Sequence, residues 1–112
     1  MADLTDLEYH RLIDALLRRI EVQADCWLQD DVIDIDAQRA GSMLELSFPN
    51  RSKIVVNAQP PLHELWLASK AGGYHFAWRD GQWADTKTAQ SFDAVFNDQV
   101  SLQAGRPLQL SS

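Results

Sequence analysis

Apolar residues near the start of the chain recur at three- and four-residue spacing, which is typical of one face of a helix. These positions are Tyr9, Leu12, Ile13, Leu16, Ile20, Ala24 and Trp27. Thr5, with Glu8 three residues later, predicts a capping box that begins the helix. A second stripe on the same helix holds polar and charged side chains: His10, Asp14, Arg18, Glu21 and Asp25. We expect an amphipathic helix that buries one side and presents carboxylates on another.

The pattern then changes to alternation of apolar and polar residues, as in strands with one buried face. Segments 33–38, 43–48 and 53–57 alternate in this way, and shorter candidate strands follow at 64–68, 74–78 and 82–84. Predicted turns at 39–42, 49–52 and 80–81 are short. Because parallel strands need long crossovers, turns this short require antiparallel neighbours.

A second amphipathic helix carries Phe92, Val95 and Phe96 on its apolar side and stops at Gly105. Residues 104–112 are predicted to fray. The order of elements predicts one α+β domain over residues 1–112. This domain is a two-layer sandwich in which both helices pack on one face of a sheet of about six antiparallel strands. The other face of the sheet is then free for function.

The net charge of −6 is unevenly distributed. Residues 1–40 hold ten Asp or Glu and four Arg, whereas residues 41–112 hold six acids and six bases. We call the acids of residues 21–36, a stretch without Lys or Arg, the acidic ridge: Glu21, Asp25, Asp30, Asp31, Asp34 and Asp36. Such a field repels phosphate backbones and anionic lipid, so nucleic acid and membrane are excluded as partners. Cations or a basic protein are favoured.

The sequence contains no apolar run of membrane-spanning length, and its first residues lack the order of a secretory signal. Cys26 is the single cysteine, so we expect a reducing, cytoplasmic location. Cys26 is interpreted as a small buried hydrophobe. A reactive thiol or a haem ligand is the alternative.

Carboxylates are hard oxygen ligands that suit hard cations. The stretch 30–36 lacks the glycine and closing glutamate of a calcium loop, and no Cys or His group has zinc spacing. Ions should therefore bind weakly, and manganese or calcium fits as well as iron. A simply solvated acidic face is the alternative. His10 and Asp14, one helical turn apart, either share a cation or are ordinary surface residues.

Trp66 is predicted to face outward, because Leu65 and Leu67 take the buried side of its strand. Asn57 faces outward by the same alternation, and an exposed tryptophan beside amides is typical of a binding hot spot. The alternatives are that Trp66 merely covers the sheet, or that a register slip buries it. His63 and His75 are interpreted as structural.

Three segments carry motifs that are specific enough to compare with a known protein family. Residues 52–68 read SKIVVNAQPPLHELWLA, residues 72–76 read GGYHF, and residues 8–12 read EYHRL. Together they resemble the bacterial branch of the frataxin family, over most of residues 7–100. Val22, Cys26 and Leu28 stand where the family pattern has further acids, which affects the number and affinity of ions.

The resemblance implies weak, reversible binding of iron (Fe²⁺ or Fe³⁺) by the acidic ridge. It also implies docking onto the cysteine desulfurase and the iron–sulfur scaffold machinery, with Asn57, Gln59 and Trp66 as contacts. We expect no enzyme activity, and a monomer in the absence of excess iron. The leading hypothesis is an iron donor or regulator in iron–sulfur cluster assembly. The alternatives are a ferroxidase or iron-storage protein, an iron donor to haem synthesis, and a purely structural adaptor.

Overall fold

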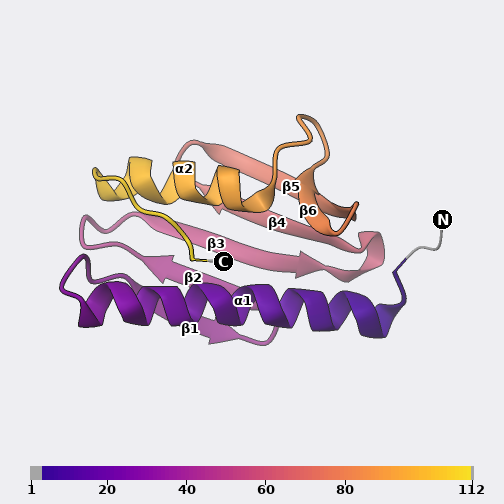
Figure 1. The fold of residues 1–112 in the computed structure, drawn as a ribbon, viewed down its shortest axis with the longest axis horizontal. Helices are drawn as coiled ribbons and strands as arrows, with labels where there is room; N and C mark the ends of the chain where they lie inside the picture. The colour runs from indigo at the N-terminus through magenta and orange to yellow at the C-terminus, as the bar shows by residue number, and fades with distance from the viewer. Residues whose placement is uncertain (1–3, 112) are drawn as a thin grey trace.

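The computed structural model describes residues 4–111, which form a two-layer α/β sandwich (Figure 1). Its elements are α1 (Asp6–Gln29), β1 (Asp36–Ala40), β2 (Met43–Ser47), β3 (Lys53–Gln59), the 3₁₀ turn η1 (Pro60–Leu62), β4 (Glu64–Ser69), β5 (Gly72–Arg79), β6 (Gln82–Asp85) and α2 (Phe92–Ala104). No helix within residues 4–111 combines the length and the apolar character needed to cross a membrane.

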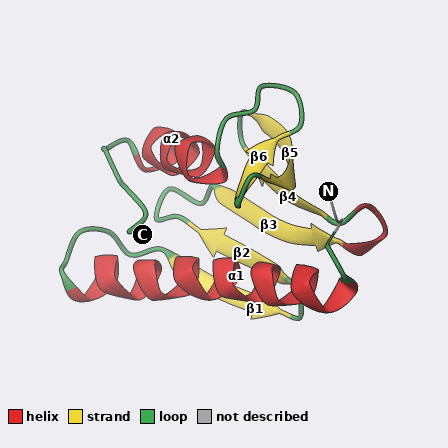
Figure 2. Ribbon diagram, turned by 45° about the vertical axis from the view of Figure 1, so that its right-hand side comes forward, coloured by secondary structure: helices red, strands yellow, loops and turns green. Residues whose placement is uncertain are grey.

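The six strands form one antiparallel sheet whose spatial order follows the chain, from β1 at one edge to β6 at the other. Both helices lie on the same face of this sheet, and the opposite face is open (Figure 2). Short turns make this order the simplest one, because each strand folds back on its predecessor. The predicted fold class is confirmed.

Alternation along the strands and periodicity along the helices bring the apolar side chains together between the two layers. Strands β2 to β5 contribute seven of these buried residues: Leu44, Leu46, Ile54, Val56, Leu65, Leu67 and Phe76. Ile13, Leu17 and Ile20 of α1 and Phe92, Phe96 and Val100 of α2 face them. Because this core occupies one side of every central strand, the remaining residues of those strands must face outward.

The start of α1 is fixed by a capping box within the helix and by hydrogen bonds from the helix to the sheet. The predicted capping box is present, with the Glu8 amide bonded to the Thr5 side chain and the Glu8 carboxylate bonded to the Thr5 amide. The buried Tyr9 hydroxyl donates to the Glu64 carbonyl (2.5 Å) and accepts from the Gln59 amide (3.0 Å). Burial raises the pKa of Tyr9; the Gln59 hydrogen bond opposes this rise and the charge of Glu64 adds to it. Tyr9 thereby holds the end of β3 and the start of β4.

The first strand differs from the prediction. β1 begins at Asp36, three residues later than the predicted segment 33–38. The amides of Val32 and Ile33 bond back to the carbonyl of Trp27 (2.8 and 3.3 Å), so these residues complete the end of α1 and do not join the sheet. The apolar side chain of Ile35 is nevertheless buried.

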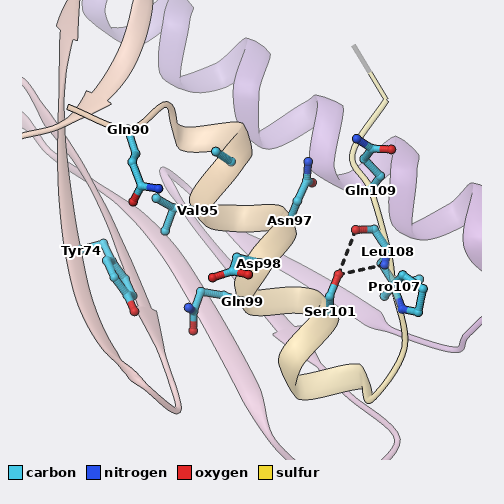
Figure 3. A pocket seen from close by; sticks show the side chains of 11 residues that line it. Tyr74, Gln90, Val95, Asn97, Asp98, Gln99, Ser101, Pro107, Leu108 and Gln109 are labelled. Atoms are coloured by element: carbon cyan, nitrogen blue, oxygen red, sulfur yellow. Dashed lines mark hydrogen bonds between the residues drawn. The ribbon is translucent and has the colours of Figure 1, made fainter. Parts of the chain in front are cut away.

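The chain after α2 is packed, so the prediction that residues 104–112 fray is wrong for the residues described. Leu108 and Leu110 are 7% and 6% exposed and belong to the core. The Ser101 hydroxyl donates to the Leu108 carbonyl (3.0 Å) and accepts from its amide (2.8 Å) (Figure 3). The Leu110 amide donates to the Asn97 side chain (2.8 Å). Two leucines at alternating positions supply apolar area that a short irregular segment can bury.

Candidate functional site

Trp66 lies on the open face of the sheet, as predicted. Its neighbours Leu65 and Leu67 are 0% and 1% exposed beneath the helices, whereas Trp66 is only partly buried. Asn57 of β3 stands directly opposite Trp66, and His75 of β5 stands opposite on the other side. Residues opposite each other in antiparallel strands share a face, so these three side chains are neighbours.

The indole of Trp66 is held from two directions. It stacks on the imidazole of His75, with ring centroids 4.0 Å apart and planes inclined by 6°. Its Nε1–H donates to the Glu64 carboxylate at 2.9 Å. A stacked aromatic pair contributes about 0.5–1.5 kcal/mol beyond buried area. The side chain is therefore ordered before a partner arrives, which lowers the entropy cost of binding.

Four residues in register across β2 to β5 form a surface that we call the platform: Met43, Asn57, Trp66 and His75. Met43 is 41% exposed, a large fraction for an apolar side chain. In the neighbouring row of the sheet, Val55 stands opposite Ala68. Both side chains are small, so the surface beside Trp66 does not protrude. An aromatic and apolar centre with polar groups beside it is the composition of a protein-binding surface.

Gln59 and His75 lie on the same open face as Trp66. Gln59 follows Asn57 by two residues, so it shares the outward side of β3. Its backbone amide is used by Tyr9. His75 is exposed and stacks on Trp66, so its interpretation as a merely structural residue was incomplete. Because Phe76 is apolar and pairs with Leu65, alternation along β5 was the signal that places His75 outward.

The acidic ridge runs from the flank of α1 to the edge strand β1. Glu21 and Asp25 lie on α1, Asp30 and Asp31 follow its last turn, Asp34 lies in the connection, and Asp36 begins β1. All are exposed except Glu21, which is partly buried. Within residues 4–111, no three His, Cys, Asp or Glu side chains are close enough to hold one metal ion together. The ridge is an extended negative surface without a cage.

Arg39 compensates part of this charge, which the count over residues 21–36 did not anticipate. Its guanidinium bonds to Glu21 (3.0 Å) and to Asp14. Burial lowers the pKa of Arg39, but its hydrogen bonds to Glu21 and Asp14 outweigh that effect and leave the pKa raised. Arg39 reaches α1 because it pairs with the buried Leu44 and so lies on the helix side of β1.

The other acids of the ridge form no ion pair among the described residues, although the Arg106 guanidinium donates to the Val32 carbonyl between them (2.5 Å). Within the described chain, no ion pair engages Asp25, Asp30, Asp31, Asp34 or Asp36. The last turn of α1 has no basic residue. This end of the helix carries the negative pole of the helix dipole, which adds to the field of the neighbouring carboxylates. A cation is therefore attracted most strongly at the end of the ridge that adjoins the last turn of α1.

His10 and Asp14, predicted to share a cation, are engaged elsewhere. The His10 ring packs edge-on against Tyr9, with centroids 5.2 Å apart. Asp14 is bonded to Arg39. Neither side chain is committed to the other in this arrangement.

Cys26 is exposed, so its interpretation as a small buried hydrophobe was wrong. Trp27 occupies the neighbouring core position and is 7% exposed. Adjacent helix residues point about 100° apart, and burial of Trp27 therefore turns Cys26 toward solvent.

The fold and this site define a class of small α/β sandwich proteins with a negative flank and an open, partly aromatic sheet face. Residues 2–106 match the model of the frataxin-like domain. The chain belongs to this frataxin-like family, as its sequence motifs indicated.

Several known proteins are similar over nearly the whole chain. An iron-sulfur cluster assembly protein CyaY from Polaromonas sp. is 46% identical over 105 residues, which are 94% of this chain and 90% of the relative. The protein of the same name from Albidiferax ferrireducens is 46% identical over 109 residues, covering 97% and 100% of the two chains. Frataxin from Psychromonas ingrahamii has a similar structure, with a TM-score of 0.84, 28% identity and coverage of 97% and 100%.

Proposed function

We propose that this chain takes part in iron–sulfur cluster assembly as an iron-binding protein, either as an iron donor or as a regulator of the cysteine desulfurase. Relatives with 42–46% identity are named iron-sulfur cluster assembly proteins, which supports the assembly role. The observation that carries the proposal is the joint presence of five exposed carboxylates outside any described ion pair on one flank and a preorganised tryptophan on the adjoining open face.

Iron is the proposed ligand of the acidic ridge. Fe²⁺ and Fe³⁺ accept oxygen ligands, and the exposed aspartates supply them without a closed site. Such an ion keeps much of its water and exchanges easily, which suits delivery or sensing. The protein needs no catalytic centre for either role.

The platform is the proposed docking surface for the desulfurase or its scaffold partner. Trp66 is the anchor, Asn57 and Gln59 supply amides for specific hydrogen bonds, and the ridge attracts a basic region of the partner. The two surfaces then have separate roles: the platform determines whether the complex forms, and the ridge determines whether iron is carried.

Trp66→Ala tests this division. Truncation of a hot-spot tryptophan should weaken binding to the bacterial cysteine desulfurase–scaffold complex by about 30-fold or more. Fe²⁺ binding, measured by paramagnetic broadening of the amides of residues 21–36, should stay unchanged. Leu102→Ala is the matched control, because Leu102 is 68% exposed on α2, away from the platform. Equal loss of complex and iron binding would contradict the division.

The converse variant, Asp30→Asn/Asp31→Asn/Asp34→Asn, should lose the broadening, whereas Asp98→Asn on α2 should keep it. Oxidation of Fe²⁺ in air, compared with a protein-free control, is measured in the same series. Turnover above that control would favour a ferroxidase.

A further inference from the structure

Three basic side chains meet at the end of the sheet where the β2–β3 and β4–β5 turns lie. Arg51, Lys53 and Lys70 line an open cavity of about 480 Å³, whose lining also includes the apolar Val55 and Ala68. None of the residues that line this cavity is acidic. In a chain of net charge −6, three of the six bases of residues 41–112 are gathered in this one place.

A buried glutamine fixes the two turns that carry these bases. Gln103 of α2 is 6% exposed. Its Nε2–H₂ donates to the Ser52 hydroxyl (2.9 Å) and to the Lys53 carbonyl (3.2 Å), and its Oε1 accepts from the Lys70 amide (2.8 Å). The Gln103 backbone carbonyl also accepts from the Asn50 side chain (2.7 Å). One side chain thus sets the spacing between two hairpin turns, so the backbone that carries the three bases is in place before an anion binds.

Most of the positive charge is uncompensated. Lys53 has a long contact with Glu45 (3.5 Å) and is 57% exposed, so this ion pair is weak. Arg51 and Lys70 form no ion pair within residues 4–111. The cavity therefore offers between two and three positive charges.

We propose that this pocket binds a small anion carrying at least two negative charges, namely a phosphate or a polycarboxylate. A guanidinium forms paired hydrogen bonds with either group, and lysines supply point charges that follow the anion's shape. The cavity is of the size that holds small molecules. The proposal requires neither the acidic ridge nor the docking role of the platform, so it stands or falls separately from the proposed function.

Titration of the ¹⁵N-labelled protein with inorganic phosphate, pyrophosphate and citrate tests the pocket. The ionic strength is held constant with sodium chloride. Amide shifts of residues 50–53 and 69–71 should saturate in the millimolar range or below for at least one multivalent anion. Saturation by pyrophosphate alone assigns a phosphate ligand, and saturation by citrate alone assigns a polycarboxylate.

Lys53→Gln/Lys70→Gln should weaken this binding at least about tenfold, since each cation close to the anion contributes about a factor of five in water. Arg79→Gln/Lys87→Gln removes the same charge from exposed positions outside the cavity and should leave binding within about twofold. Shifts that rise linearly, or equal weakening in the two double variants, would overturn the proposal, because either result means general ionic attraction.

Discussion

Replacing Arg39 with glutamine is expected to strengthen cation binding at the acidic ridge and to destabilise the fold. The Arg39 side chain is 24% exposed and bonds to Glu21 and Asp14. Without it, both carboxylates lose their positive partner and the flank gains one negative charge. The two effects have opposite consequences for function and for stability, so one variant separates them.

The size of each effect follows from the exposure of the partners. Glu21 and Asp14 are 34% and 71% exposed, and an ion pair of this kind contributes about 0.2–1 kcal/mol to stability. Loss of both pairs should cost about 1 kcal/mol, which lowers the Tm of a domain of this length by about 4 °C. A unit charge near a divalent ion changes its binding by about 1 kcal/mol in water, or roughly fivefold, and by less at physiological salt.

Anaerobic Fe²⁺ titration at low and at physiological salt, with thermal unfolding in parallel, measures both quantities. Arg79→Gln is the control, because it makes the same change in net charge at an exposed turn away from the ridge. A lower Tm with unchanged Fe²⁺ affinity would refute the reasoning, since the ion would then bind beyond the reach of Glu21 and Asp14. A reduced affinity would show instead that Arg39 organises the carboxylates for the metal.

Two further predictions concern the ends of the chain. The pKa of Glu8 is lowered by hydrogen bonds with Thr5, so its stabilising effect is present above the ordinary value of 4.5 and is lost as the pH falls through the lower folded-state value. Because Glu8→Gln keeps the capping geometry without the charge, its Tm deficit at pH 7, measured by circular dichroism, should shrink as the pH falls from 7 toward 3; a deficit that does not shrink would exclude the charge as its cause. Leu110→Ala should destabilise the protein to urea by about 2–5 kcal/mol, whereas Leu102→Ala should change stability by less than about 0.5 kcal/mol. Similar midpoints for the two leucine variants would mean that the packed tail contributes little.

The features that the sequence predicted well are those encoded by local periodicity. Buried and less buried positions alternate along β2 and through the first four residues of β3 and of β4, so the burial of Leu65 and Leu67 and the outward position of Trp66 followed from the pattern. The capping box depends on two residues within one turn, and both hydrogen bonds are present. Each of these inferences needs only neighbours in the chain.

The features that it missed depend on contacts between distant residues. Arg39 lies outside the acidic stretch, and only the pairing of β1 with β2 turns it back toward α1. The segment after Gly105 has no periodicity, and its burial results from a surface that α1 and α2 create together. His75 required the register of the β4–β5 hairpin in addition to its own alternation.

The pairing register of β1, β2 and β3 explains how a partner on the open face can be oriented. Asp36, Ser47 and Lys53 are direct cross-strand neighbours on β1, β2 and β3, so the sign of charge reverses across the sheet from the ridge to the cavity. Two strand spacings are about 10 Å, which is close to the screening length in physiological salt. A charged partner therefore interacts separately with the negative charge at β1 and with the positive charge at Lys53. A partner with a basic patch is attracted at β1 and repelled near Lys53. We therefore expect such a partner to favour one of the two orientations that a flat face alone would allow equally.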